Sequence, residues 1–218
     1  MNRADFVVAH AASATARPRT RITAEIAITP TAPDLLVPFT VSIALRNPTH
    51  AVQPVDFPSA TELYRIDVLR GGTTVWTSAH PASLHTPRRI ELSPGTQQLV
   101  FYDVDCVTGD RHAFAAGAYV VRVTILGSVL TSVYERTITY AEPLTIAQAL
   151  KSSGEVTTAG APGAAAGGPS LTDATGTLRV STALGLHPSG RYIVRGTIDR
   201  SAAVPVLRVS RFLPASNP

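Results

Sequence analysis

The fold of this chain follows from one stretch, VPFTVSIAL, which runs from Val37 to Leu45. Its apolar side chains occupy every second position, which is the period of a β-strand with one buried and one exposed face. Similar alternation appears at Ile22 to Ile28, Tyr64 to Val68 and Tyr119 to Ile125. Gly71-Gly72 separates two β-rich runs and predicts a tight hairpin, because glycine tolerates the positive φ angles of that turn. These patterns predict an all-β protein.

The spacing of the runs predicts the architecture of the first part of the chain. About seven strands fall within roughly 120 residues, which is the spacing of an immunoglobulin-like (Ig-like) β-sandwich. Prolines lie between the runs or near their starts, where they remove no hydrogen bond from the centre of a sheet. We therefore expect residues 21–140 to form an Ig-like antiparallel sandwich.

A change of pattern after Tyr140 predicts a second domain at residues 141–218. Thr145 and Gln148 fit a capping box, which predicts a short helix between them and Leu150. Strands are expected at Glu155 to Ala159, Ser170 to Thr172, Thr177 to Ser181, Arg191 to Ile198 and Val206 to Phe212. The segment from Gly160 to Pro169, rich in Ala, Gly and Pro, predicts a flexible loop. Since so short a domain has a small core, we expect it to dock on the first.

The composition limits the class of protein. Charged residues make up 16% of the 218 residues and the net charge is +4, too small to decide whether the arginine-rich surface binds anions. Cys106 is the only cysteine, so no intramolecular disulfide can form. The apolar run at Phe6 to Ala9 is too short for a signal peptide, and no stretch has the length of a membrane span. We expect a flexible tail at residues 1–20 and a cytoplasmic location, with export left open.

An ordered set of motifs covers residues 22–127. In chain order they are Asn47-Pro48-Thr49, Val55 to Ala60, Tyr64 to Val68, Val75 to Ser78, Pro94-Gly95 and Gly117 to Val123. In this set the chain resembles the BsuPI-type intracellular proteinase inhibitors. The resemblance implies an Ig-like sandwich and, as one function found in that family, inhibition of subtilisin-like serine proteases.

A second set of motifs covers residues 144–213. It consists of Val156 to Gly160, Leu171 to Val180, Tyr192 to Ile198 and Leu207 to Val209. These residues resemble small bacterial OB-fold modules of nucleic-acid-processing proteins. The resemblance implies a small OB-like β-barrel with a short leading helix, whose second and third strands form the hairpin that carries ligand contacts.

Two groups of residues are candidate binding sites. The first is an exposed loop that would contact another protein, with His80, Leu84, His85, Arg88 and Arg89 as the candidate residues. The second is the face of the OB-like domain, with Arg179, Arg195 and Arg200 as candidate contacts to anions. Single-strand binding also needs stacking aromatic residues, and this domain offers only Tyr192 and Phe212.

Catalytic and metal chemistry is not indicated by the sequence. Asp103, Asp105 and Asp110 lie close together, but their spacing is not that of an EF-hand, so a solvated loop is expected. Cys106 and His112 lack a third group to orient the base, and an inert thiol is expected. The only tryptophan, Trp76, is predicted to lie in the core. We expect no enzyme, no cofactor and no metal.

Three functions remain open at this point. The first is a non-catalytic protein-binding protein built on an Ig-like sandwich. The second is an inhibitor of a subtilisin-like serine protease, and the third is weak single-stranded nucleic-acid binding through the OB-like domain. The expected partner is thus another protein, with nucleic acid as an alternative, and the sequence does not indicate the oligomeric state.

Overall fold

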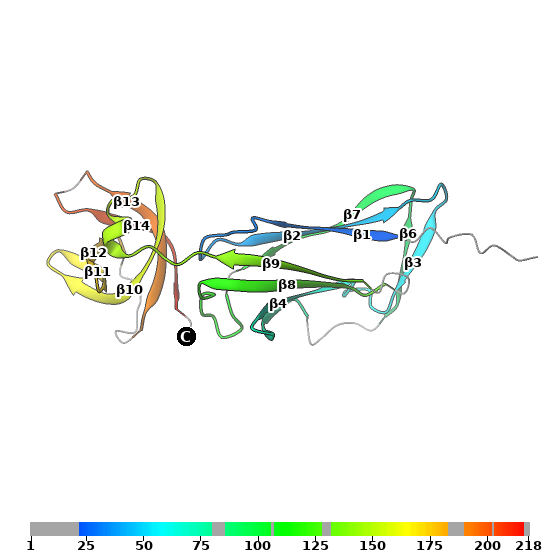
Figure 1. Cartoon of the computed structure of the whole chain (residues 1–218), viewed down its shortest axis with the longest axis horizontal. Coiled ribbons are helices and arrows are strands. Elements are labelled where there is room, and N and C mark those ends of the chain that lie inside the picture. Colours follow the sequence, from blue (N-terminus) through cyan, green and yellow to red (C-terminus); the bar gives the residue numbers. More distant parts are fainter. Residues whose placement is uncertain are drawn as a thin grey trace, which may run out of the picture.

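The computed structural model describes residues 22–79, 86–105, 107–127, 132–182, 190–201 and 203–215. These residues form an all-β structure with one short helix, as the alternation predicts. Figure 1 shows an elongated molecule with β1 to β9 at one end and α1 with β10 to β14 at the other. The predicted tail at residues 1–20 lies outside the described residues.

The first part of the chain folds into antiparallel sheets. A three-stranded sheet has the order β1 (Thr23–Thr29), β2 (Phe39–Asn47) and β7 (Gly95–Val104). A four-stranded sheet has the order β5 (Thr73–Thr77), β4 (Tyr64–Arg70), β8 (Gly117–Ile125) and β9 (Ser132–Tyr140). A separate pair joins β3 (Gln53–Phe57) to β6 (Arg88–Leu92).

The core lies between the apolar faces of these sheets. Every second residue of β2, beginning with Phe39 and Val41, is fully buried, and so are Ile66 and Val121 from the four-stranded sheet. The strand predicted around VPFTVSIAL is therefore confirmed. The predicted hairpin at Gly71-Gly72 is confirmed too, since both glycines have positive φ angles, of 55° and 85°.

The pair β3 and β6 was not predicted. Pro54 lies within β3, and Arg88-Arg89 were expected to belong to a loop because they are charged and follow a proline. In the structure Asp56 pairs with Arg89 across the two strands. Partners far apart in sequence stabilise this pair, and a local pattern does not contain that information.

The second part of the chain forms a ring of five strands that closes on itself. Its order is β10 (Glu155–Ala165), β11 (Gly168–Asp173), β12 (Gly176–Val180), β14 (Val206–Pro214) and β13 (Tyr192–Asp199), which returns to β10. All neighbours are antiparallel except β12 and β14, which are parallel. The turn between β11 and β12 is held by Asp173, whose carboxylate accepts hydrogen bonds from the backbone of Thr175 and Gly176.

The helix α1 (Ile146–Ala149) begins with the predicted capping box. The Thr145 hydroxyl accepts from the Gln148 backbone, and the Gln148 side chain accepts from the Thr145 backbone. Ile146 and Ala149 are buried against the inside of the ring, together with Leu171 and Leu178. The helix therefore supplies part of the core of this small ring.

The segment from Gly160 to Pro169 is not the loop that its composition predicts. It continues β10 as far as Ala165, pairs with β11 and enters that strand at Gly168. A Cβ at Gly160 would lie 2.6 Å from the carbonyl oxygen of Thr172, so only glycine lets the two backbones approach. Small residues are needed here because the strands pack closely. Composition alone does not show whether small residues serve close packing or a flexible loop.

No helix in the described parts of the chain has both the length and the apolar character that crossing a membrane requires.

Gly196 offers a direct test of this close packing. A Cβ there would lie 2.1 Å from the carbonyl oxygen of Arg208 in the neighbouring strand. We expect Gly196→Ala to lower the free energy of unfolding by about 1–3 kcal/mol, because the strands must move apart. Gly163→Ala is the matched control, since the atom nearest to its added Cβ is the Ser170 Oγ at 3.4 Å. Urea denaturation followed by circular dichroism measures both, and equal losses would contradict this explanation.

Candidate functional site

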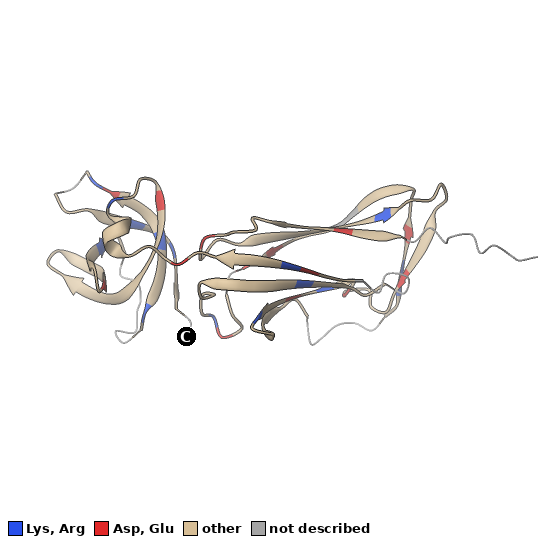
Figure 2. Cartoon of the chain, viewed as in Figure 1, with Lys and Arg blue, Asp and Glu red and all other residues tan. Residues whose placement is uncertain are grey.

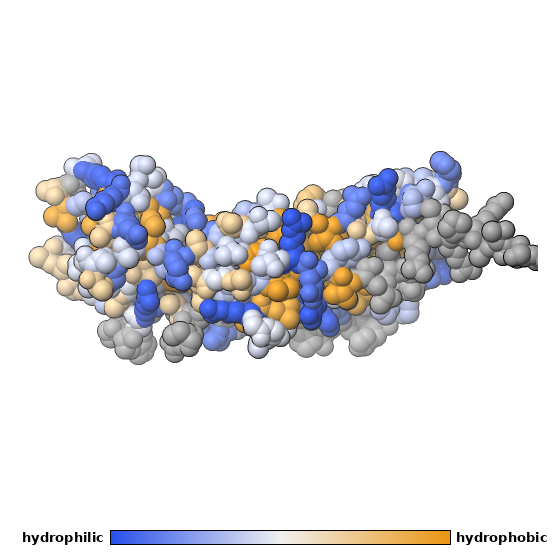
Figure 3. All heavy atoms as spheres, viewed as in Figure 1, coloured by the Kyte–Doolittle hydropathy of each residue, from blue (hydrophilic) through white to orange (hydrophobic). Residues whose placement is uncertain are grey.

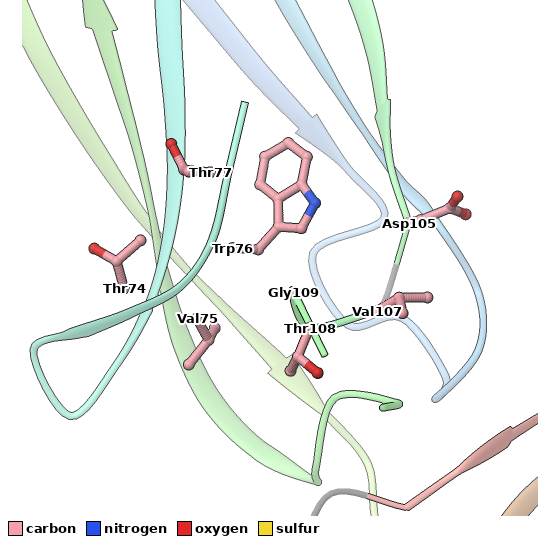
Figure 4. A pocket seen from close by; sticks show the side chains of 8 residues that line it. All are labelled: Thr74, Val75, Trp76, Thr77, Asp105, Val107, Thr108 and Gly109. Atoms are coloured by element: carbon pink, nitrogen blue, oxygen red, sulfur yellow. The ribbon is translucent and has the colours of Figure 1, made fainter. Parts of the chain in front are cut away.

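A hollow of about 470 Å³ lies at one edge of the first part of the chain. We call it the Trp76 hollow; it is lined by Thr74, Val75, Trp76, Thr77, Asp105, Val107, Thr108 and Gly109. One wall is the edge strand β5 and the other is the segment that follows β7. Figure 4 shows the Trp76 indole between these walls, while the carboxylate of Asp105 points away from it.

Trp76 is the aromatic side chain that lines this hollow, and Tyr102 and Tyr64 pack next to it without lining it. The ring of Trp76 meets that of Tyr102 edge-on, with centroids 5.8 Å apart, and Tyr102 meets Tyr64 in the same way at 6.5 Å. All three are partly buried and pack against the main core cluster. The prediction that Trp76 lies in the core is therefore only half right, because its side chain also lines the hollow. Burial raises the pKa of the Tyr64 phenol above its ordinary value, so this hydroxyl stays neutral.

The wall formed by Asp105 and by Val107 to Gly109 is held in place by the ring. Arg211 on β14 forms an ion pair with Asp105 at 3.2 Å and donates to the carbonyl oxygen of Leu36 at 3.1 Å. The Ala113 backbone N–H donates to the carbonyl oxygen of Pro214 at 2.8 Å. The second part of the chain thus positions one side of the Trp76 hollow, although none of its residues lines it.

The contacts between the two parts of the chain form what we call the junction. Leu35 and Leu36 are buried there, with Ala159 and Ile193 of the ring joining the same core cluster. Arg195 forms ion pairs with Asp34 at 3.2 Å and with Glu155 at 2.7 Å, and its side chain is only 18% exposed. The second part of the chain thus docks on the first, as expected, and the contact combines buried apolar side chains with ion pairs.

The three arginines predicted to bind anions are all engaged by protein groups. Arg195 lies in the junction, Arg179 donates to the carbonyl oxygen of Gly167, and Arg200 donates to those of Leu150 and Ser152. These partners lie in different segments, and the structure does not bring the three guanidinium groups together in one groove. Figure 2 shows both signs of charge spread along the chain rather than one basic face. Anion binding by this set stays a prediction.

The predicted protein-binding loop can be followed only in part. His80, Leu84 and His85 lie outside the described residues. Arg88 is exposed on β6, and the Nε of Arg89 pairs with Asp56 at 2.7 Å. This hydrogen bond lowers the pKa of the Asp56 carboxyl. Neither arginine lines the Trp76 hollow.

The three carboxylates around Cys106 do not converge. Asp103 accepts from the Thr40 hydroxyl, Asp105 pairs with Arg211, and Asp110 accepts from Thr108 and lies 3.0 Å from His112 Nδ1. No group of three or more metal-binding side chains occurs among the residues that the structure describes. Cys106 itself is outside them.

A second hollow, of about 550 Å³, lies on the ring. It is lined by Thr145, Gly160, Ala161, Thr172, Asp173, Ala174, Thr175, Gly190 and Arg191. The carboxylate of Asp173 is already used by the α1 backbone at Ile146 and by the turn to Gly176. This hollow contains no aromatic side chain on which a base could stack.

Comparison with known proteins finds no family model that matches the chain and no curated protein that resembles it. Sequence reasoning missed the cluster of Trp76, Tyr102 and Tyr64 because Tyr64 and Tyr102 come from different sheets. The one signal for this site in the sequence was Trp76, an aromatic residue on the five-residue strand β5.

Arg195, which lies in the junction, should contribute more to stability than Arg208, which lies outside it. We expect Arg195→Ala to lower the free energy of unfolding by about 1–2 kcal/mol, because it removes ion pairs with Asp34 and Glu155 that are partly shielded from water. Arg208→Ala is the control, since that side chain is 66% exposed and, among the described residues, forms an ion pair with Asp199 alone; it should cost less than about 0.5 kcal/mol. Urea denaturation measures both. A larger loss for Arg208→Ala would contradict the role assigned to the junction.

Glu155 predicts a dependence of stability on pH. Hydrogen bonds from Ser210 at 2.9 Å and Arg195 at 2.7 Å hold the pKa of its carboxyl below the ordinary value of 4.5. As the pH falls, the Glu155 carboxyl therefore takes up its proton at a higher pH in the unfolded chain than in the folded chain. The stability contributed by Glu155 is complete above pH 4.5 and is lost as the pH drops through the folded pKa.

Glu155→Gln is the variant that isolates this effect. Its urea midpoint should fall less steeply than that of the wild type between about pH 5 and pH 3, because one titrating group is gone. Other carboxylates titrate in both proteins and cancel in the difference. Parallel curves for the two proteins would show that Glu155 contributes nothing to acid sensitivity.

Proposed function

We propose that this chain is a non-catalytic protein-binding module, and that the Trp76 hollow is its binding site. The observation that carries the proposal is the Trp76 indole, which lines a hollow on an edge of the fold and packs against Tyr102, which in turn packs against Tyr64. Tyr and Trp are enriched where proteins bind proteins, because they offer a large apolar area with a polar tip and few rotatable bonds. Partial burial against the core keeps these rings in place before a partner arrives.

The polarity of the hollow supports a protein partner. Its lining consists of threonines, valines, glycine, Trp76 and Asp105, and the Asp105 carboxylate is directed to Arg211. A phosphate or nucleic-acid site would need cationic side chains, and the lining has none. The only carboxylate among the lining residues, Asp105, is paired with Arg211, and the lining contains no histidine, lysine or cysteine.

The architecture fits such a role. Two facing antiparallel sheets of three and four strands agree with an Ig-like sandwich, and the closed ring with one parallel strand pair agrees with an OB-like barrel. In this assignment the sandwich carries the binding site. The ring acts through Arg211, which holds the outer wall of the hollow.

The broad face of the sandwich is a weaker candidate than its edge. Figure 3 shows apolar atoms over β8 and β9 that are crossed by hydrophilic ones. On this face Arg122 pairs with Glu135 at 2.7 Å, and Asp67 accepts from Arg65 and Thr77. A partner would have to cover these ion pairs, whereas at the Trp76 hollow the Asp105 carboxylate, which is paired with Arg211, points away from the indole.

The test uses short random peptides displayed on phage and selected on the immobilised full chain. Trp76 is the only tryptophan, so its fluorescence reports on the hollow alone. Selected peptides should change this emission, and Trp76→Ala should weaken their binding about thirtyfold, as expected for a hot-spot residue. Calorimetry measures affinity in the variant, and Trp76→Phe should restore part of it.

Phe212→Ala is the matched control, because Phe212 is an exposed aromatic residue on the ring, 38% accessible and outside the hollow. Its affinity for the peptides should equal that of the wild type. The proposal is wrong if no selected peptide alters the Trp76 emission, or if Trp76→Ala binds as tightly as the wild type.

A further inference from the structure

One wall of the Trp76 hollow is β5, a strand at the edge of its sheet. β5 is the first strand in the order β5-β4-β8-β9, and within the described residues no strand pairs with its outer side. The row of backbone N–H and C=O groups along such an edge is a template for another strand. The edge therefore indicates the conformation of the ligand, an extended strand, which the aromatic rings by themselves do not.

The direction of the backbone groups can be assigned from the ladder. The Ser78 N–H donates to the Ile66 carbonyl oxygen at 2.8 Å, so Ser78 faces β4. Neighbouring residues of a strand direct their backbone groups to opposite sides, so the N–H and C=O of Thr77 face outward along the hollow. The ladder is regular at Trp76 and Thr77, and its only irregularity lies at Val75.

The two edges of this sheet differ in how they are protected. Edge strands are usually blunted by charged residues, proline, bulges or short length. β9 carries Glu135 and Arg136, and its Thr139 N–H donates to the Thr31 carbonyl oxygen at 3.3 Å. β5 is short and bulged, but it has neither a charge nor a proline, since its sequence is TTVWT. Of the two edges, β5 is therefore the one without a charge or a proline, and no strand pairs with its outer side among the described residues.

The opposite wall gives the hollow the form of a slot. Val107 pairs with Ala113 in an isolated bridge, and Thr108 and His112 are joined by hydrogen bonds across a tight turn. Ala113 is in turn held by Pro214 and Ala215 of the ring. This wall is thus fixed from behind, and an occupant of the hollow lies between it and the β5 edge.

We propose that an extended, uncharged segment of another protein binds here by adding a strand to the outer edge of β5, with an apolar side chain against Trp76. The inference rests on the proposed function and names its mode and partner chemistry. An extended segment supplies donors and acceptors for the Thr77 backbone, which has no strand partner on its outer side among the described residues, and strand addition gains affinity in this way. The segment is uncharged because the β5 edge is uncharged and the Asp105 carboxylate is engaged by Arg211.

The deciding variant is Thr74→Lys, tested with the same selected peptides and the full chain. Thr74 is exposed on β5, and a lysine there protects an edge against pairing. We expect a loss of affinity of at least about tenfold. Thr137→Lys on β9 is the matched control, because it makes the same change at an exposed position of the opposite edge; its affinity should stay within about twofold. Equal urea midpoints confirm that both variants are folded.

Amide hydrogen exchange measured by NMR tests strand addition separately from peptide binding at the Trp76 hollow. Peptide binding should slow exchange of the Thr77 amide, which then donates to the added strand. If Trp76→Ala abolishes binding while Thr74→Lys does not and the Thr77 amide stays unprotected, the binding site stands and strand addition is wrong. If sedimentation shows that the chain alone forms dimers that Thr74→Lys dissociates, the occupant is a second copy, and the proposed partner is wrong.

Discussion

The arrangement of this chain depends on the burial of one apolar face from each of two sheets. Side chains that alternate along β2 and β8 fill the space between the sheets, and residues such as Val41 and Val121 have no exposure to water. Burial of this kind is the main favourable contribution to folding. It requires only that the two faces meet, and it leaves the edges of the sheets to be covered in some other way.

The gap between the two sheets is covered differently along its two sides. On one side β9 lies near β1, and a hydrogen bond from Thr139 to Thr31 closes the gap. On the other side β5 and β7 end their sheets, and the gap is filled by rings, with Trp76 against Tyr102. Aromatic side chains exclude water from the core but satisfy no backbone groups of an edge strand. The hollow and its chemical character both follow from this difference.

The ring is more than an appended unit, because it completes one wall of the hollow. Arg211 reaches Asp105 and Leu36, and Arg195 reaches Asp34, so two guanidinium groups connect the parts across the junction. Their fixed planar geometry suits simultaneous contacts to carboxylates and carbonyl oxygens. Arg195, one of the arginines predicted to bind anions, and Arg211 thus help to orient the two parts of the chain.

The sequence alone determined the elements whose signals are local. Period-two alternation placed most of the sandwich strands, Gly71-Gly72 placed a hairpin, and Thr145 with Gln148 placed the helix, because each depends on residues within a few positions of one another. Local composition failed where long-range packing decides the conformation, as at Gly160 to Ala165, which forms a strand, and at Arg88-Arg89.

The tertiary structure alone decided the site. Trp76, Tyr102 and Asp105 meet because two sheets face each other and the ring docks against them. Arg195 and Arg211 face the junction because β13 and β14 direct them toward the first part of the chain. Neither arrangement has a signature in any short stretch of sequence. Side-chain direction and sheet edges are properties of which strands pair, and pairing is settled by contacts between residues far apart in the chain.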